Sequence, residues 1–380
     1  MRTLGETLHT YWIRLQGELL PWLDDALGPL GEHHQQLVSV LGLARIEALV
    51  PSLGGLVGRP PSERAALARA FVAKSIFNLA STAMLIERLA ADKTLRRLCG
   101  WQHPGELPSA STFSRAFAAF AKNELPSRLH ERLIEHSHAD RLVGHISRDS
   151  TAIEAREAPR PVAKAPPAAK YRRGRPRKGE VRAPPPVRRI ERQVTMSLTA
   201  MLADLPRHCD IGSKRNANGH QESWVGYKLH IDTADGGIPI SCILTSASVH
   251  DSQVAIPLAT MTAARVVNLY DLMDSAYDVA EIKRHSRKLG HVPLIDVNPR
   301  VTPGLKQELA DEAKRQRCVG HRPAEAVRYR ERSTAERVNS ALKDSHGGRT
   351  LRVRAPAKVM CHLMFGVLSL TALQMIRLII

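Results

Sequence analysis

The chain has 380 residues, with 55 Lys and Arg against 37 Asp and Glu, so its formal net charge is +18. That length allows two or three domains, and a hydrophobic content of 43% excludes a chain that is disordered throughout. The five cysteines stand far apart, with no partner at zinc-ligand spacing, which excludes a disulfide scaffold and a zinc finger and fits a reducing, cytoplasmic compartment. The positive charge favours a polyanionic partner, most often nucleic acid, although an arginine-rich composition alone is the alternative.

Residues 1–140 have the pattern of an all-α domain. Paired glycines at 54–55 and paired prolines at 60–61 separate an earlier helical region from a later one. In the later region five residues recur at spacings of three and four, which predicts one face of a single helix: Ile76, Leu79, Ala83, Ile86 and Ala90.

Another helix of this domain is predicted to start at the Ser and Thr residues of 109–112, with Phe113, Phe117 and Phe120 facing inward. Arg115 lies on the same helix. Two interpretations remain open: a helix-turn-helix whose second helix uses Arg115 to contact DNA ends, or a support domain that makes no groove contact.

More than half of the net charge is concentrated in one short segment. Residues 156–192 contain 13 Lys or Arg, 3 acidic residues and 8 of the 24 prolines. Dense proline disfavours helix and sheet, and like charges repel one another, so a disordered insert is predicted at about 156–193.

Within this insert, residues 173–176 resemble the Arg-Gly-Arg-Pro core of an AT-hook. Such a segment places arginines in the narrow minor groove of A·T-rich DNA, and a generic linker that touches phosphates is the alternative. The basic side chains predicted to bind DNA here are Arg173, Arg175, Arg177 and Lys178.

From residue 141 onward the pattern is α/β. Strands are predicted at 142–146, 224–231, 238–244, 266–270 and 292–295, and helices at about 251–264, 276–289, 324–344 and 357–378. The sequence Asp-Gly-Gly at 235–237 predicts a hairpin turn between the second and third strands. This order predicts a mixed sheet flanked by helices. The last helix is apolar, but polar residues interrupt it, so we expect it to be buried against the sheet and not to span a membrane.

Four polar residues at spacings of 3, 4 and 7 fall on one face of the helix predicted at 324–344: Tyr329, Arg332, Glu336 and Lys343. The opposite face is apolar. A carboxylate among donors of this kind suits a phosphate site, because the carboxylate can bind a metal ion while the cations bind phosphate oxygens. The alternatives are a solvated face with ordinary ion pairs, or a capping box in which Ser333 and Glu336 only start a helix.

Two aspartates are predicted to stand at strand ends. Asp149 follows the first strand and Asp274 follows the fourth. If these strands are neighbours, the two carboxylates meet at one edge of the sheet, and Glu336 can reach them from its helix. Three oxygen ligands of this kind suit two Mg²⁺ or Mn²⁺ ions that assist an in-line displacement at phosphorus.

Other candidates are weaker on sequence grounds. Asp271 is an alternative to Asp274 but is expected to lie inside the strand. Cap, loop or other structural positions are favoured for the remaining polar candidates, which are Asp251, Asp278, Asp296, His145, His230 and His250. For the two aromatics, Trp224 and Tyr227, packing in the core is favoured over stacking on a base.

The spacing Tyr329-x2-Arg332-x3-Glu336-x6-Lys343 resembles the Tyr-Arg-Glu-Lys signature of bacterial insertion-sequence DDE transposases, the insertion-sequence-four type and its relatives. The segments around Asp149 and Asp274 resemble the first and second catalytic aspartates of that family. The resemblance covers about residues 141–380, and residues 65–125 more loosely resemble the helical N-terminal region.

The resemblance implies an RNase H-like catalytic domain in which Asp149, Asp274 and Glu336 bind two Mg²⁺ and the other signature residues hold phosphates. It implies cleavage at terminal inverted repeats followed by strand transfer into target DNA, with a homodimer in the DNA complex. Only about 30 residues separate the fifth strand from the Glu336 helix, too few for the large β-rich insertion domain of some relatives. A catalytically silent, domesticated transposase that only binds DNA is the alternative function, and the signature spacing disfavours a resolvase-like nuclease.

Overall fold

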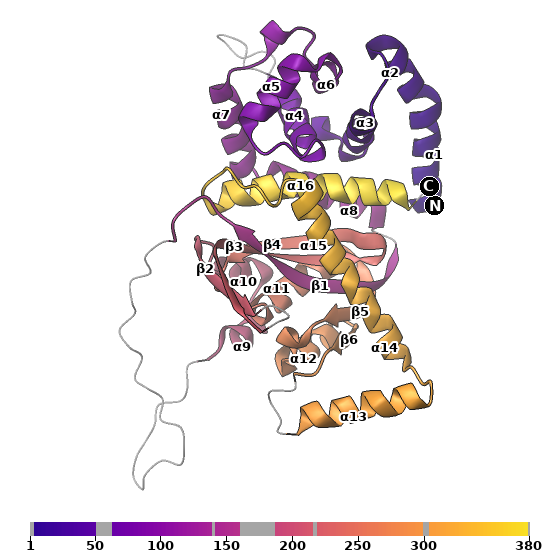
Figure 1. The fold of residues 1–380 in the computed structure, drawn as a ribbon, viewed down its shortest axis with the longest axis vertical. Coiled ribbons are helices and arrows are strands. Elements are labelled where there is room, and N and C mark those ends of the chain that lie inside the picture. Colours follow the sequence, from indigo (N-terminus) through magenta and orange to yellow (C-terminus); the bar gives the residue numbers. More distant parts are fainter. Residues whose placement is uncertain are drawn as a thin grey trace.

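The computed structural model describes residues 4–50, 63–138, 141–159, 187–215, 219–298 and 304–378. A helical region formed by the first part of the chain stands above a mixed sheet that has helices on both faces (Figure 1). The predicted fold class is thereby confirmed: the arrangement is RNase H-like and is preceded by an all-helical region.

The helical region consists of the following elements: α1 (Leu4–Arg14), a π-helical turn (Leu15–Leu19), α2 (Leu20–Leu27), α3 (Glu32–Ala44), α4 (Arg64–Ile76), α5 (Thr82–Ala91), α6 (Lys93–Cys99), α7 (Ala110–Lys122) and α8 (Leu125–His138). The single helix predicted through residues 76–90 is wrong, because α4 ends at Ile76 and α5 begins at Thr82. Asn78 adopts a left-handed conformation with φ 48°, and the Ser81 hydroxyl accepts a hydrogen bond from the Met84 amide and starts the new helix. The predicted break at 54–61 lies outside the described residues.

On α7 the three phenylalanines at 113, 117 and 120 are buried, as predicted. The helix begins after Ser109, whose hydroxyl bonds to the hydroxyls of Ser111 and Thr112, so no side chain caps its amides. Arg115 is exposed and donates to the Thr112 hydroxyl at 3.3 Å.

Six strands form the sheet: β1 (Leu142–Glu154), β2 (Asp210–Arg215), β3 (Gln221–Ala234), β4 (Ile238–Ser246), β5 (Val267–Met273) and β6 (Val292–Ile295). The order is β2-β3-β1-β5-β6, with β4 paired to the second half of β3. Strand β1 runs antiparallel to β3 and parallel to β5, and β5 runs parallel to β6. The predicted hairpin of β3 and β4 is confirmed, with Gly236 and Gly237 at φ 73° and 76° in its turn.

Strand β1 is much longer than predicted, since it continues past Asp149 to Glu154. Asp149 therefore lies inside the strand and does not follow it. The second half of β1 is polar in sequence, but backbone pairing with β3 over residues 146–154 keeps this half extended. Strand β2 was not predicted, because its six residues carry no alternating apolar pattern.

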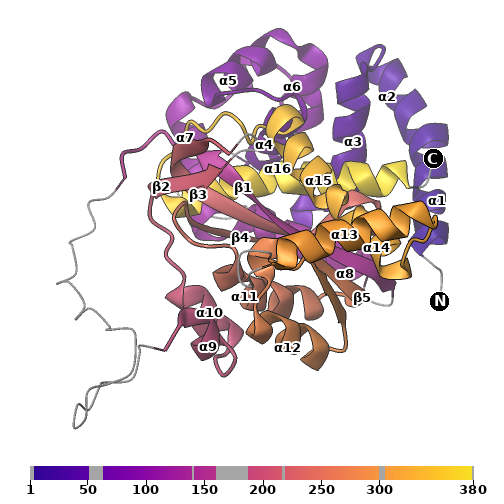
Figure 2. The ribbon, with the colours of Figure 1, turned by 60° about the horizontal axis from the view of Figure 1, so that its bottom comes forward.

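The helices of the second half are α9 (Arg189–Gln193), α10 (Leu198–Asp204), α11 (Ser252–Ala263), α12 (Ala280–Lys288), α13 (Leu305–Cys318), α14 (Ala324–Tyr329), α15 (Ser333–Ser345) and α16 (Pro356–Arg377). A 3₁₀ turn at Arg330–Arg332 joins α14 to α15, and another at Ser275–Tyr277 follows β5. The predicted disorder at 156–193 is wrong for its last five residues, which form α9. The segment 305–318, left without structure in the sequence interpretation, forms α13, which lies beside α14 (Figure 2).

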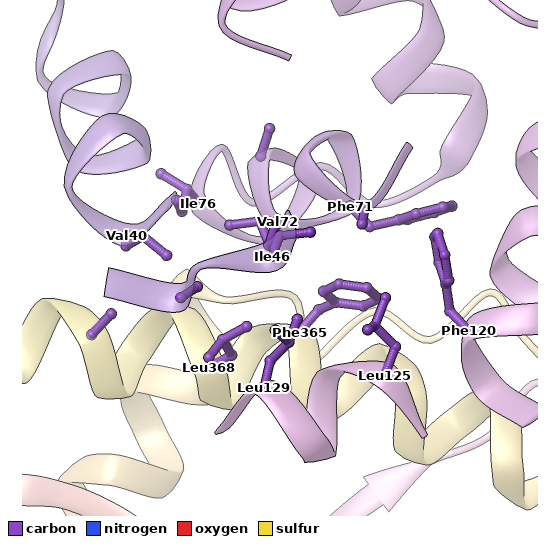
Figure 3. Close-up of a cluster of buried hydrophobic side chains, with 14 of the residues drawn as sticks. Val40, Ile46, Phe71, Val72, Ile76, Phe120, Leu125, Leu129, Phe365 and Leu368 are labelled. Carbon is purple, nitrogen blue, oxygen red and sulfur yellow. The ribbon is translucent and has the colours of Figure 1, made fainter. Parts of the chain in front are cut away.

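Helix α16 supplies the core of the helical region. Its residues Phe365 and Leu368 point toward α4 and α8, and the Phe365 ring lies 5.8 Å from that of Phe71 and 6.4 Å from that of Phe120 (Figure 3). Among described helices, α16 is the one long and apolar enough to cross a membrane, yet most of it is buried inside the protein. The prediction of a buried helix is confirmed, and the two parts of the chain share one continuous core.

We expect Phe365→Ala to reduce the free energy of unfolding by about 3–5 kcal/mol, because it opens a cavity where three aromatic rings meet. The exposed Val319→Ala on the loop after α13 is the matched control and should change it by less than about 0.5 kcal/mol. Urea denaturation followed by far-UV circular dichroism measures both values. Equal effects would contradict a core centred on α16.

Candidate active site on β1, β5 and α15

The two catalytic candidates on the sheet stand level with one another. Strands β1 and β5 are parallel, and their last paired residues are Ser147 and Leu272. Asp149 and Asp274 each lie two residues further along, so they occupy equivalent positions on strands about 4.8 Å apart. The condition set in the sequence analysis, that the two strands are neighbours, is met, and Asp149 inside β1 lies beside Asp274 at the end of β5.

A residue of α15 holds the side chain of Asp149 in place. Its Oδ2 accepts a hydrogen bond of 3.0 Å from Nδ2 of Asn339, a buried residue of α15. Burial raises the pKa of Asp149 to about 6, and the negative charges of Asp274 and Asp251 add to that shift, while Arg332 opposes it. The carboxylate is therefore poorly solvated and has negative neighbours, an environment that favours binding of a cation.

Asp274 directly follows β5, as predicted. Its Oδ1 accepts a hydrogen bond of 2.9 Å from the Ala276 amide and starts the 3₁₀ turn. Burial raises its pKa above the ordinary value, and the charges of Asp251 and Asp296 act in the same direction. Asp149 and Asp274 thus share one electrostatic environment.

The four residues singled out in the sequence lie on the helical segment formed by α14, the 3₁₀ turn and α15. The Tyr329 hydroxyl donates to the Met273 carbonyl at 3.2 Å, which fixes α14 against the end of β5. The Ser147 hydroxyl donates to the Glu331 carbonyl at 3.1 Å, which fixes the connecting turn against β1. Both contacts anchor the helix beside the aspartates.

Glu336 and Arg332 form an ion pair of 2.6 Å, and the Arg332 guanidinium also lies over the Tyr329 ring, 5.9 Å from its centre. Glu336 is half exposed and takes no part in a capping box, because Ser333 already lies inside α15 and the residue before it, Arg332, makes no side-chain cap hydrogen bond. The capping alternative for Glu336 is therefore wrong. Lys343 lies two turns further along. Burial lowers its pKa, and the charges of Lys214 and Arg349 add to that effect, while the nearby carboxylates of Glu154 and Asp344 oppose it.

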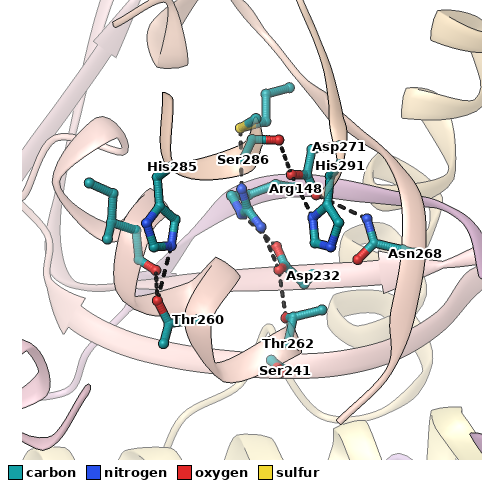
Figure 4. Close-up of polar contacts among 12 residues, drawn as sticks. Arg148, Asp232, Ser241, Thr260, Thr262, Asn268, Asp271, His285, Ser286 and His291 are labelled. Atoms are coloured by element: carbon teal, nitrogen blue, oxygen red, sulfur yellow. Dashed lines mark hydrogen bonds and ion pairs between the residues drawn. The ribbon is translucent and has the colours of Figure 1, made fainter. Parts of the chain in front are cut away.

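A buried polar network surrounds Arg148, the residue before Asp149 (Figure 4). Arg148 donates to both carboxylate oxygens of Asp232 at 2.8 and 2.7 Å, and the Thr262 hydroxyl donates to the same carboxylate. Since Arg148 and Asp149 are adjacent in β1, their side chains point to opposite faces, Arg148 toward α11 and Asp149 toward α15. Asp271 lies in this network, buried with Ser286 and His291, and so does not replace Asp274 at the site.

The other weaker candidates have mainly structural contacts. Asp278 accepts from Lys283, His145 pairs with Asp235, His250 bonds to Ser252, Trp224 donates to the Tyr227 carbonyl, and Tyr227 is fully buried. Asp296 differs, because it lies near Asp274 and its carboxylate bonds to Tyr329.

The sequence interpretation missed Asn339. Its position three residues after Glu336 on the same helix is the signal that could have found it.

The residues present fit a divalent cation in chemical type. Asp149 and Asp274 supply oxygen ligands on neighbouring strands, and Glu336 lies on α15, the helix that contacts Asp149 through Asn339. Within the described ranges, however, no three carboxylate, imidazole or thiol groups lie close enough together to enclose one ion. The Glu336 carboxylate is paired with Arg332, so it would have to rotate toward the sheet to join such a site. The AT-hook-like residues Arg173, Arg175, Arg177 and Lys178 lie outside the described residues.

An RNase H-like sheet with paired aspartates on parallel strands defines a class of α/β proteins that act on nucleic-acid phosphates. Two family models match the chain: the Transposase DDE domain over residues 145–372 and the Transposase domain (DUF772) over residues 24–119. Because the first covers more than half of the residues, the chain belongs to the DDE transposase family. No curated protein and no solved structure matches it.

Family membership confirms the resemblance to insertion-sequence DDE transposases at the level of the family. It implies an activity that cleaves nucleic acid during transposition, DNA as the partner, and a general dependence on divalent metal ions. The first match runs from β1 into α16, and the second runs from the second half of α2 to most of α7.

We expect Asp149→Asn to stabilise the metal-free protein by about 1–3 kcal/mol at pH 8. A carboxyl group whose folded pKa is raised to about 6 stabilises the fold below its unfolded pKa near 4 and loses that contribution as the pH rises through 6. The gain of the Asn variant should therefore be small at pH 4 and largest above pH 7. Chemical denaturation in EDTA from pH 4 to 8 measures it, and a pH-independent difference would contradict the raised pKa.

Proposed function

We propose that this protein is the transposase of an insertion sequence, which cleaves DNA at terminal inverted repeats and then joins the released end to target DNA. The observation that carries the proposal is the level placement of Asp149 and Asp274 on parallel strands, facing the helix that bears Tyr329, Arg332, Glu336 and Lys343. In sequence, these residues resemble the Tyr-Arg-Glu-Lys signature and the two aspartates of such enzymes.

Asp149, Asp274 and Glu336 would hold two Mg²⁺ or Mn²⁺ ions, which supply activation of the attacking hydroxyl and stabilisation of the leaving oxygen. The Arg332 guanidinium would release Glu336 when a phosphate approaches and would bind that phosphate instead, since guanidinium pairs equally well with either anion. Lys343, Lys214 and Arg349 would neutralise phosphates further along the DNA end. Asn339 would keep the Asp149 carboxylate in one orientation, so that little reorganisation is needed during reaction.

The other parts of the chain would bind DNA. The helical domain, residues 1–140, would recognise the element ends, with Arg115 exposed on α7 as its candidate contact. The basic insert at about 156–193 would act as an additional tether, and two copies of the chain would pair two element ends. Such a protein works in the cytoplasm, where the bacterial chromosome lies.

The second candidate function is a domesticated transposase that binds DNA without cutting it. The electrostatics of the sheet edge disfavour it. Asp149 and Asp274 both have raised pKa values because of burial and neighbouring carboxylates, which destabilises the fold at neutral pH. A protein that only binds DNA gains nothing from an acidic cluster facing a polyanion.

We expect Asp149→Ala, Asp274→Ala and Glu336→Ala to reduce metal-dependent nicking of DNA that carries the inverted repeats by at least about a hundredfold, because each removes a ligand of the reacting centre. DNA affinity in a gel-shift assay should stay within about twofold of the parent, since no phosphate contact is removed. Asp278→Asn, which alters a carboxylate bonded to Lys283, is the control and should cut normally. Undiminished cutting by the three Ala variants would overturn the assignment.

Replacing residues 160–186 by a Gly-Ser linker of equal length should weaken DNA binding at low salt and flatten its salt dependence. The segment contains nine Lys or Arg and one Glu. Each phosphate that the variant no longer neutralises reduces the slope of log K against log salt by about 0.9. Fluorescence anisotropy over a salt titration measures the slope. An unchanged slope would show that the insert is a passive spacer.

A further inference from the structure

The helical segment that carries Glu336 is preceded by a pair of helices that stand apart from the core. Helices α13 and α14 lie beside one another (Figure 2), and a cleft of about 760 Å³ separates them. Neither helix contains a buried residue. Helices in proteins owe most of their stability to the packing of one face, so two helices without a buried face point to a partner outside this chain.

The side chains that line this cleft are basic. Arg317 comes from the last turn of α13, Arg322 from the loop between the helices, and Arg330 from the 3₁₀ turn after α14. All three are exposed, and among the described residues none of them forms an ion pair with a carboxylate. Residues 314–330 contain six Lys or Arg and one acidic residue. The cleft therefore offers several guanidinium groups to an anion, and these groups suit phosphate oxygens.

The two ends of the α14–α15 segment have different surroundings. At the C-terminal end of α15, Asn78 Nδ2 donates to the Asp344 carbonyl at 2.8 Å, and the Gly347 amide donates to Asn78 Oδ1 at 3.0 Å. These bonds tie that end to the helical region. The α13–α14 cleft lies at the other end of the segment, away from the helical region (Figure 1). Glu336 lies between the two ends.

The cleft is within reach of a duplex that passes the active site. The backbone is helical at Tyr329, Arg330 and Ser333, so α14 continues into α15. Val327 of the cleft precedes Glu336 by nine residues. At about 1.5 Å per residue, this separation is about 14 Å along the helix. Because duplex DNA rises about 3.4 Å per base pair, about four base pairs cover that distance.

We propose that the α13–α14 cleft binds the phosphate backbone of duplex DNA on the side of the cleavage position that lies outside the insertion element. The inference deepens the proposed function and rests on it. In that function the helical region binds the ends of the insertion element, and Lys343 neutralises phosphates on the same side of the active site. Arg317, Arg322 and Arg330 would hold the duplex on the opposite side. Phosphate contacts of this kind position DNA without reading its sequence.

The test compares two duplexes that carry the inverted repeat, in EDTA so that neither is cut. The first ends at the cleavage position, and the second continues outward for about ten base pairs, roughly one helical turn. Fluorescence anisotropy with the full-length protein measures both affinities over a salt titration. The parent should bind the second duplex about tenfold more tightly at low salt, because additional phosphates are neutralised.

The variant that combines Arg317→Gln, Arg322→Gln and Arg330→Gln should lose this preference. Its slope of log K against log salt on the second duplex should decrease by about 2 to 3, since each lost phosphate contact removes about 0.9. Its affinity for the first duplex should stay within about twofold of the parent, because that duplex does not reach the cleft.

The matched control combines Lys306→Gln, Lys314→Gln and Arg315→Gln, which removes three charges from α13 itself. None of these side chains lines the cleft, and Arg315 is paired with Glu312 at 2.7 Å. The control should keep the preference for the longer duplex. The substituted side chains of both variants are exposed, so both should give the circular dichroism spectrum of the parent.

An unchanged preference in the cleft variant, or an equal loss of affinity for the two duplexes, would refute the inference. Target DNA presents the same phosphates, so strand transfer of the first duplex into a plasmid in Mg²⁺ separates the two sources. The cleft variant should perform it at the rate of the parent. A slower reaction with an unchanged preference would assign the cleft to target DNA and contradict the inference.

Failure of the proposed function gives a different result. If the parent neither binds the first duplex nor cuts the second in Mg²⁺, the proposed function itself is wrong. If the parent does both and shows no preference for the longer duplex, the proposed function stands and only the role of the cleft fails.

Discussion

The buried ion pair between Arg148 and Asp232 is the contact on which the geometry of the sheet edge depends. Both side chains are at most 2% exposed, and two parallel hydrogen bonds join them across β1 and β3. A slip of β1 by one residue would turn Arg148 toward α15 and bury Asp149 beneath α11, leaving two uncompensated charges. The pair therefore fixes which face of the sheet receives the Asp149 carboxylate. Breaking such a pair from one side costs about 3–5 kcal/mol, which makes the slipped register inaccessible.

From that fixed register the remaining geometry follows in steps. Parallel pairing with β5 sets Asp274 level with Asp149. The Tyr329 and Ser147 hydroxyls hold the helix opposite them, and Asn339 contacts Asp149 directly. Each contact joins a candidate residue to an element that is itself anchored in the sheet. The negative charges that this arrangement concentrates lower stability in the metal-free protein, a cost that functional sites commonly carry.

The sequence predicted those helices, strands and turns whose formation depends on residues close together in the chain. The hairpin turn at 235–237, strand β6 and the apolar helix α16 were predicted with nearly correct bounds, because turn residues and continuous apolar runs signal such elements directly. The edge strand β2 and the second half of β1 were missed, because pairing with β3, and no side-chain pattern of their own, keeps these segments extended. The break between α4 and α5 was missed because the apolar spacing continues across it by coincidence.

The candidate site divides in the same way. The four residues between Tyr329 and Lys343 could be found from helical spacing, and Asp149 and Asp274 from their places near the ends of predicted strands. Asn339 could not be assigned, because its importance comes from a contact between β1 and α15, which are far apart in sequence. A residue whose role depends on such tertiary contacts has no signal of its own in a single sequence.

Helix α16 has a consequence for the order in which the protein can fold. The helices before residue 138 complete their core only with Phe365, Leu368, Ala372 and Met375, more than 200 residues later in the chain. During synthesis the N-terminal helices therefore emerge from the ribosome long before the side chains that cover their apolar faces. Contacts of such large sequence separation slow folding, because the chain must close a long loop before burial offsets the lost entropy. The N-terminal helical region thus acquires its final structure only after α16 has been synthesised, so a nascent chain that ends before α16 contains these helices without their complete core.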